Sequence, residues 1–319
     1  MTKMSNASIH NAGATPRTAT NARSNSGRTA FFVHIPKTAG STLATIIRKQ
    51  YSDDALFDIG RAHAQAMQDS IENFRQFHGI ENVRCVMGHA PYGLHQWFPG
   101  KFTYITMLRN PVHRELSRYY FILKTPRHHQ HEKLVRSKTS LEDFVHMQSE
   151  TGFNNTQTRF VVAGDVAPDC WTNLAGPHPP LPPDAVEIAK LNIRERFAVA
   201  GTVEQFDASL LLFQQALSWG NVYYVKENVT PSSRARNSVS KELIRLIEKH
   251  NEMDVELYRF AQKRLTEQIR DGGDTFAKKL ERFRRVNRAY RAAHRARTHL
   301  QRVRGKIRLR KRLRRLLAQ

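Results

Sequence analysis

Hydrophobic residues gather in short continuous runs that are separated by longer stretches with helical spacing. The short runs are rich in β-branched and aromatic residues, which predicts buried strands. They cover residues 30–33, 83–87, 102–108, 197–202 and 222–225. Helices are expected after 43, at 62–77, from 111, at 141–147 behind a Ser140 cap, after Asp184, from 203 and from 251. This alternation predicts an α/β fold with three layers and a mainly parallel central sheet.

The join between the first strand and the first helix carries the strongest local pattern, His34-Ile35-Pro36-Lys37-Thr38-Ala39-Gly40-Ser41-Thr42. Pro36 ends the strand because it has no N–H to donate, and Gly40 opens the helix. A helix start leaves backbone N–H groups unpaired and carries partial positive charge, so it can hold a phosphate or sulfate. Lys37 adds a full charge. The stretch is not a Walker A loop, because its lysine precedes the glycine; an ordinary turn with a solvent-exposed lysine is the other interpretation.

Two further polar groups follow predicted strands, where open α/β sheets bind their ligands. His89 comes just after residues 83–87, and histidine titrates near neutral pH, as a general base for a hydroxyl must. A histidine that hydrogen-bonds its loop is the alternative, and His34 is the rival base, although we expect it to orient or underlie the loop. Arg109 ends the strand at 102–108, and Ser117 follows two turns into the next helix. Arginine and serine can grip a phosphate, or the arginine can form a surface ion pair.

In this order, the three segments resemble carbohydrate sulfotransferases, and most closely the group of heparan sulfate and uronyl 2-O-sulfotransferases. The resemblance covers about residues 30–270, with similar strings at 154–160, 203–210 and 251–258. It implies a P-loop-like fold and 3′-phosphoadenosine 5′-phosphosulfate (PAPS) as the sulfuryl donor, with no metal. The acceptor it implies is a carbohydrate or glycolipid, with residues 154–160 on the acceptor side and Ser233 or Arg234 near the nucleotide.

The resemblance also implies roles for single residues. His89 is expected to be the catalytic base and Lys37 to stabilise charge on the transferring group. Arg109 and Ser117 are expected to hold the 3′-phosphate of PAPS. The remaining expected donor contacts come from the loop and helix start, at Lys37, Thr38, Ala39, Gly40, Ser41 and Thr42.

Charge divides the chain into three parts. The net charge is +23, yet residues 29–277 hold 29 basic and 27 acidic residues, whereas 278–319 hold eighteen Lys or Arg and one acidic residue. We therefore expect a disordered segment at 1–28, a sulfotransferase domain at 29–275 and an Arg-rich helical tail at 276–319.

The sequence shows no transmembrane or signal segment, and Cys85 and Cys170 indicate no disulfide framework, so a cytoplasmic location is expected. Golgi carbohydrate sulfotransferases, with their membrane anchors, differ from this pattern.

The basic tail suggests an anionic partner. Cationic residues alternate with Leu and Ile over 308–317, which favours peripheral contact with an anionic membrane, and no motif supports sequence-specific nucleic-acid binding. The basic, His-rich loop at 124–139 is expected to border the acceptor cleft. Two other functions stay open: an NTP-using kinase or transferase of the P-loop type, and a non-catalytic protein that binds polyanions. The first lacks Gly-Lys-Ser/Thr, and the second does not explain the set of Lys37, His89, Arg109 and Ser117.

Overall fold

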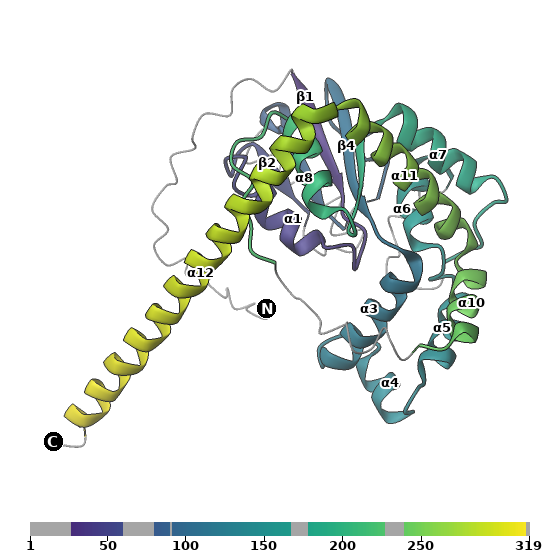
Figure 1. Ribbon diagram of the computed structural model, residues 1–319. Helices are drawn as coiled ribbons and strands as arrows, with labels where there is room; N and C mark the ends of the chain where they lie inside the picture. The colour runs from purple at the N-terminus through teal and green to yellow at the C-terminus, as the bar shows by residue number, and fades with distance from the viewer. Residues whose placement is uncertain (1–26, 60–79, 90, 167–177, 227–238, 317–319) are drawn as a thin grey trace, which may run out of the picture.

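The fold is described from a computed structural model (Figure 1), which describes residues 27–59, 80–89, 91–166, 178–226 and 239–316, with side chains as far as residue 301. Five strands form its sheet: β1 Arg28–Val33, β2 Leu56–Asp58, β3 Cys85–Gly88, β4 Lys101–Leu108 and β5 Phe197–Thr202. The α-helices are α1 Gly40–Ile47, α3 Pro111–Lys124, α4 His131–Arg136, α5 Leu141–Glu150, α6 Thr156–Val166, α7 Ala185–Glu195, α8 Phe206–Ala216, α10 Lys241–His250, α11 Glu252–Asp271 and α12 Gly273–Leu316. Two short 3₁₀ helices lie at Ile80–Asn82 and Leu94–Trp97.

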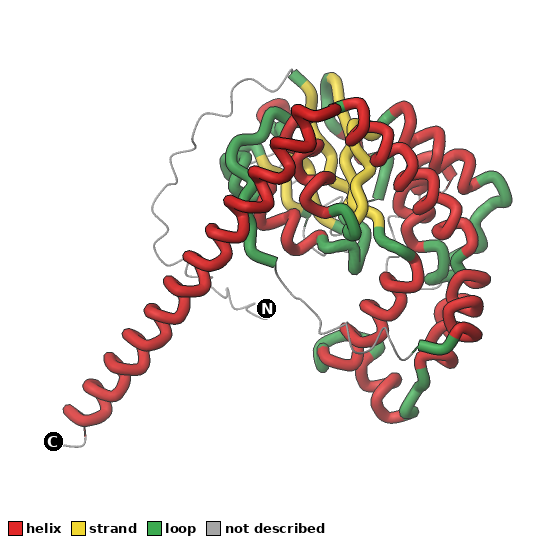
Figure 2. Tube along the Cα trace, in the orientation of Figure 1, coloured by secondary structure: helices red, strands yellow, loops and turns green. Residues whose placement is uncertain are grey.

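The sheet has the strand order β2-β3-β1-β4-β5, and every pair is parallel. The predicted α/β fold with a parallel central sheet is therefore confirmed. β1 lies in the middle, between β3 and β4, so the chain reverses its winding direction beside it. Because all strands run the same way, their carboxyl ends meet at one edge, where open sheets of this kind bind ligands. Figure 2 shows the loops of this edge on the side of the sheet that faces α3.

Helices cover both faces of the sheet, as the alternation along β1 requires. Phe31 and Val33 pack into one hydrophobic cluster, with residues of α6, α7 and the first half of α11. Ala30 and Phe32 point the other way, into a cluster with residues of α1, α8 and α12. A smaller group of helices packs beyond the carboxyl ends of the strands (Figure 1). Helices α3, α5 and α10 meet around Val112, Leu116, Val145 and Ile247, and α4 packs against α3 and α5 through Leu134.

The edge of the sheet at β5 is covered by α11. Leu257 and Ala261 belong to the cluster on one face of the sheet, whereas Leu265 belongs to the cluster on the other face. The helix therefore crosses the edge strand. The Gln268 side chain donates a hydrogen bond to the Ala198 carbonyl of β5, with N···O 3.1 Å.

One predicted strand is wrong. Residues 222–225 form no strand in the described sheet, and the three-residue β2, which was not predicted, is the strand at the edge beside β3. The hydrophobic run does mark buried residues, since Val222 and Tyr224 are both buried. However, the backbone N–H of Tyr224 donates to the side-chain oxygen of Asn287 on α12, at 2.9 Å, and not to a neighbouring strand. The hydrophobic run thus indicated burial correctly, but burial alone does not make a strand. The backbone hydrogen bond of Tyr224 is satisfied by a helix side chain.

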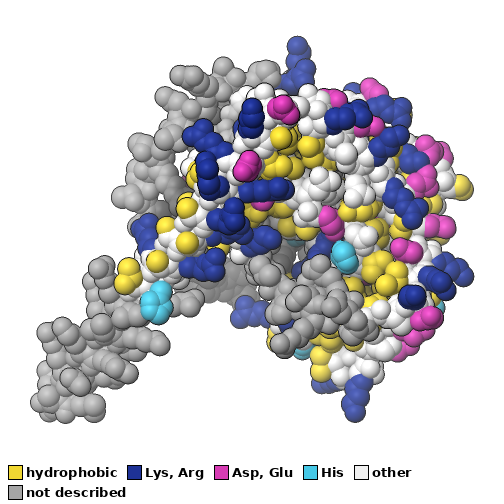
Figure 3. All heavy atoms as spheres, viewed as in Figure 1, with side chains coloured by type: hydrophobic (Ala, Val, Ile, Leu, Met, Phe, Trp, Pro, Cys, Tyr) yellow, Lys and Arg dark blue, Asp and Glu magenta, His cyan; other side chains and the backbone are white. Residues whose placement is uncertain are grey.

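The predicted helical tail is the 44-residue helix α12. Its first turns belong to the body of the protein, since Phe276 and Phe283 are only 4% and 5% exposed and pack with residues of α1 and α8. Its second half leaves the body (Figure 1), and Figure 3 shows Lys and Arg side chains gathered along the part of α12 whose side chains are described. Over the described residues, no helix has the length and apolar character to span a bilayer.

Several expectations concern residues outside those described. They are the helix at 62–77, Cys170, and Ser233 and Arg234 near the nucleotide. The side chains of the predicted membrane contact at 308–317 are likewise not described.

Candidate active site

The loop after β1 turns its backbone around the start of α1. Lys37 and Ala39 both have positive φ, 71° and 63°, and Ala39 is the residue that precedes the helix. Alternating left-handed residues of this kind turn successive N–H groups toward one side, which makes a concave anion site. The first turn of α1 holds no acidic residue and no side chain caps it. Thr38 is fully buried, and its hydroxyl donates to the Ile35 carbonyl at 2.8 Å, so this hydroxyl holds the loop and leaves the N–H for a ligand.

His34 connects this loop to His89. The two imidazole rings stack, with centroids 4.1 Å apart, and Phe32 stacks on His34 at 5.4 Å. His89 Nδ1 lies 3.1 Å from the backbone carbonyl of His34. A carbonyl oxygen can only accept, so Nδ1 carries a proton, and in the neutral imidazole Nε2 then keeps its lone pair. The contact therefore presents His89 in the tautomer that a general base needs.

Gly40 lies directly beneath the His34 ring. A Cβ at this position would lie 1.7 Å from His34 Nε2. No side chain fits there, so the glycine allows the imidazole to pack onto the start of α1. This agrees with the expected role of His34 in orienting the loop.

Lys37 and Arg109 meet at the same edge. Arg109 follows β4, and its guanidinium donates to the backbone carbonyl of Lys37 at 3.0 Å. The Lys37 ammonium lies over the ring of Phe121 on α3, 3.7 Å from the centroid. Ser117 lies one turn before Phe121 on the same side of α3 and is half-buried. The structure thus brings the loop after β1 against the face of α3 that carries Ser117.

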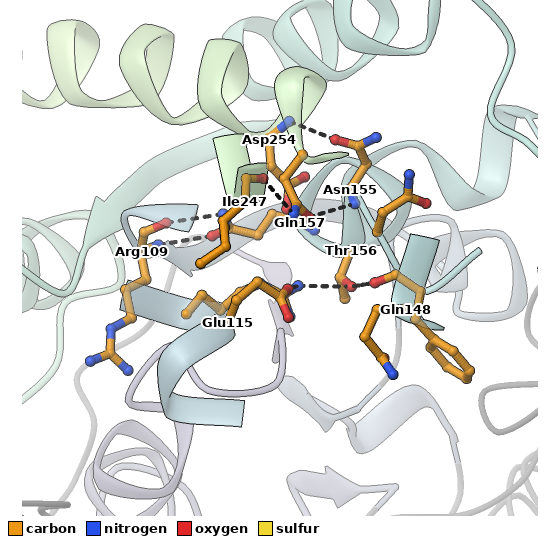
Figure 4. Close-up of polar contacts among 12 residues, drawn as sticks. Arg109, Glu115, Gln148, Asn155, Thr156, Gln157, Ile247 and Asp254 are labelled. Atoms are coloured by element: carbon orange, nitrogen blue, oxygen red, sulfur yellow. Dashed lines mark hydrogen bonds and ion pairs between the residues drawn. The ribbon is translucent and has the colours of Figure 1, made fainter. Parts of the chain in front are cut away.

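Arg109 is held in place from behind by a chain of hydrogen bonds (Figure 4). Its N–H donates to the Gln157 side chain at 2.8 Å, and the same amide donates back to the Arg109 carbonyl at 3.0 Å. Gln157 lies in the first turn of α6, and its own N–H donates to the Asp254 carboxylate of α11. Asp254 also accepts from the N–H and the hydroxyl of Thr158, at 2.7 and 2.9 Å. A buried carboxylate thus caps α6 and fixes the end of β4.

Asp254→Asn is expected to lower the free energy of unfolding by about 2–4 kcal/mol. Both carboxylate oxygens accept from backbone N–H groups, and an amide has one oxygen, so one N–H loses its partner. Denaturant unfolding measures the change. The matched control is Asp271→Asn at the exposed end of the same helix, which should change stability by less than about 0.5 kcal/mol. Equal stability of the two variants would contradict this role for Asp254.

Glu204, which follows β5, fixes the start of α3 in a similar way. Its carboxylate accepts from the N–H of Asn110 at 3.2 Å and from the Tyr258 hydroxyl at 3.0 Å, and it lies 3.5 Å from His113 Nδ1. Burial raises the pKa of this carboxyl, but the hydrogen bonds from His113, the backbone and Tyr258 outweigh it, so that the pKa lies below its ordinary value. The carboxylate form is therefore the one that orients α3.

The sequence predicted the site residues at the strand ends but not the residues that hold them in place. Lys37, His89 and Arg109 come together with the start of α1, whereas Phe121, Gln157 and Asp254 were not singled out. Phe121 carried a signal, since it lies four residues after Ser117 on the predicted helix. The His-rich loop joins the same region through His128, whose ring meets the edge of Phe121 with centroids 6.0 Å apart. Across the described ranges, no three potential metal-ligating side chains come together.

Comparison with known proteins supports a carbohydrate sulfotransferase. A family model described as galactose-3-O-sulfotransferase matches residues 2–315, nearly the whole chain. No curated protein matches the chain. The match therefore agrees with the expected resemblance to carbohydrate sulfotransferases, but it does not extend to the heparan sulfate and uronyl 2-O group. By this match, the chain belongs to the galactose-3-O-sulfotransferase family.

Proposed function

We propose that this protein transfers a sulfuryl group from PAPS to a hydroxyl of a carbohydrate that carries galactose. The observation that carries the proposal is the meeting of three groups at the carboxyl edge of the sheet. These are the N–H cradle with Lys37, the His89 imidazole in its basic tautomer, and the Arg109 guanidinium on the Lys37 carbonyl. The family match supports the sulfotransferase class and suggests galactose as the acceptor unit.

The donor would be held by positive charge and N–H groups without a metal. Arg109 and Ser117 would hold the 3′-phosphate, and the N–H groups of residues 38–42 would hold the phosphosulfate. When bound, PAPS supplies an activated sulfuryl group and a phosphate leaving group. Lys37 would balance the charge that develops on these oxygens, and its cation–π contact with Phe121 already directs the ammonium toward α3.

The acceptor hydroxyl would give its proton to His89 Nε2. The base has its lone pair because Nδ1 donates to the His34 carbonyl, and the stack on His34 limits rotation of the ring. A base fixed in one tautomer and one orientation needs little reorganisation when the proton moves. His34 would thus act through His89 as a positioning residue.

The first test is thermal unfolding with 3′-phosphoadenosine 5′-phosphate, the desulfated product of PAPS. At a ligand concentration 100 times Kd, the folded state gains about 2.7 kcal/mol, which raises Tm by several degrees. We expect this shift in the wild type without Mg²⁺, and its loss in Arg109→Ala. Arg282→Ala, on the exposed face of α12, should keep it.

The same measurement separates the alternative functions. An NTP-using enzyme would be stabilised by ATP with Mg²⁺ and not by 3′-phosphoadenosine 5′-phosphate. A polyanion-binding protein without a donor site would respond to neither nucleotide, or equally in wild type and Arg109→Ala. Either result would contradict the proposed donor site.

A further inference from the structure

Arg118 lies on the face of α3 that turns toward α5, and its guanidinium has unusual surroundings. It is half-buried, and within the described part of the chain it makes no hydrogen bond or ion pair. Its guanidinium carbon lies 4.8 Å from the ring centroid of Phe153 and 5.9 Å from that of Phe144. The rings hold the planar group by cation–π contact but leave its N–H donors without acceptors.

The nearest carboxylate does not neutralise Arg118. Glu115 lies one turn earlier on α3, but it forms a buried ion pair with Arg114, which also donates to the Thr156 hydroxyl. Asp254 also interacts electrostatically with Arg114, so both nearby carboxylates are engaged by that guanidinium and neither pairs with Arg118. Burial lowers the pKa of Arg118 to about 10, with Glu115 opposing and Arg114 adding to the effect, so the group remains charged at neutral pH.

Gln148 adds a second polar group without partners. Its side chain is 3% exposed, and among the described residues neither its amide nitrogen nor its amide oxygen has a hydrogen-bond partner. Phe144 packs against Ile122, and Val145 against Leu116, so this side of α5 faces α3. Gln148 lies three to four residues further along α5 and therefore faces the turn of α3 that contains Arg118.

A histidine ring also contacts Phe153, close to the charges of Arg159 and Arg118. The imidazole of His178 meets Phe153 edge-on, with centroids 4.9 Å apart, and the backbone N–H of His178 donates to the Thr151 carbonyl. Burial lowers the pKa of His178, and the nearby charges of Arg159 and Arg118 lower it further. The region around Phe153 thus has a positive potential that favours an anion.

This positive region lies beside the candidate active site. Arg118 is three residues before Phe121, which is a rise of about 4.5 Å along the helix. Phe121 carries the Lys37 ammonium on its face. A group bound by Arg118 would therefore lie within about one helix turn of the residue that contacts Lys37.

We propose that Arg118, Gln148, Phe153 and His178 form an acceptor subsite that binds a negatively charged group of the sugar, a carboxylate or a sulfate. Arginine binds either group through two parallel N–H···O bonds, and its fixed fork makes this recognition specific. The inference rests on the proposed function and narrows its substrate class to acidic galactose-containing glycans. A neutral galactose would leave the guanidinium without an acceptor.

The test is calorimetric binding to the full-length protein saturated with 3′-phosphoadenosine 5′-phosphate. The probes are methyl β-D-galactopyranoside, its 6-sulfate, and methyl β-D-galactopyranosiduronate. We expect one or both anionic probes to bind the wild type about tenfold or more tightly than the neutral one. Arg118→Gln should remove this preference and leave the neutral probe unchanged. Arg118→Lys keeps the charge without the fork and should retain part of the preference, and Arg136→Gln, an exposed arginine of α4, should retain all of it.

Three results would overturn the proposal. The first is equal binding of the charged and neutral probes by the wild type. The second is an undiminished preference for the charged probes in Arg118→Gln. The third is loss of nucleotide binding in folded Arg118→Gln, because Arg118 would then bind the donor nucleotide and not the acceptor. If Arg118→Gln does not fold, the preference for the charged probes is compared between the wild type and Arg118→Lys. A reduced preference in Arg118→Lys supports the subsite, and an unchanged preference contradicts it. Failure of the wild type to bind the nucleotide at all would refute the proposed function. The probes would then be titrated without nucleotide, and a preference for the anions that is lost in Arg118→Lys would still support the subsite.

Discussion

His89→Ala is expected to lower kcat for sulfuryl transfer by about 10²–10⁴-fold while the protein keeps its affinity for the donor nucleotide. The imidazole follows β3 and stacks on His34, and its Nδ1 faces the His34 carbonyl, so that Nε2 is the basic atom. Without this base, the acceptor hydroxyl must lose its proton to water. Transfer from PAPS to lactose, as a galactose-bearing acceptor, measures the rate, and thermal unfolding with 3′-phosphoadenosine 5′-phosphate measures donor binding.

His89→Asn makes this test sharper. The Asn amide nitrogen can replace Nδ1 as the donor to His34, but no atom replaces Nε2, so the variant should be as inactive as His89→Ala. His146→Ala, an exposed histidine of α5, should keep full activity. An active His89→Asn would exclude His89 as the base, and loss of nucleotide binding in both His89 variants would assign the residue a structural role.

Gly40→Ala is expected to lower kcat/KM by about 10²-fold and the free energy of unfolding by about 1–3 kcal/mol. The added methyl group would lie 1.7 Å from His34 Nε2 and 1.9 Å from Cδ2, so the imidazole must move. Once it moves, His34 no longer stacks on His89 at the present 4.1 Å, and the base loses its support. A 10²-fold loss corresponds to about 2.7 kcal/mol of transition-state stabilisation, which is similar in size to the expected loss of folding stability.

The matched control is Gly220→Ala. Its added methyl group would meet nothing closer than the Gln50 side-chain oxygen at 3.7 Å, an ordinary contact, so activity should not change. The double variant His34→Ala/Gly40→Ala should recover most of the stability but not the activity, because the clash is gone and the stack is also gone. Full activity of Gly40→Ala would show that the His34 ring does not need its present position.

Local sequence patterns were sufficient for the fold and for the residues that end its strands. The buried run before Pro36 and the helix start at Gly40 are readable because strand, turn and helix are neighbours in the chain. His89 and Arg109 could be placed on the same edge because parallel strands put their carboxyl ends together. Ser140 was predicted as a helix cap, and its hydroxyl accepts from the N–H of Asp143, as a cap must.

The supports of the site depend on residues far apart in sequence. Gln157 is 48 residues from Arg109, and Asp254 is a further 97 residues away, so no local pattern indicates that these side chains meet. The wrong strand at 222–225 has the same origin. The hydrogen-bond partner of Tyr224 is Asn287, which lies in the segment set apart as an Arg-rich tail, although its side chain is only 1% exposed.

The crossing of α11 over β5 has a consequence for self-association. An open edge strand offers unpaired N–H and C=O groups that another chain can use to extend the sheet, which is a common route to aggregation and to capture of extended peptides. Here α11 crosses that edge, and the Gln268 amide donates a hydrogen bond to the Ala198 carbonyl. Contacts with other molecules on this side must therefore be made through helix side chains, because a foreign strand cannot be added at β5.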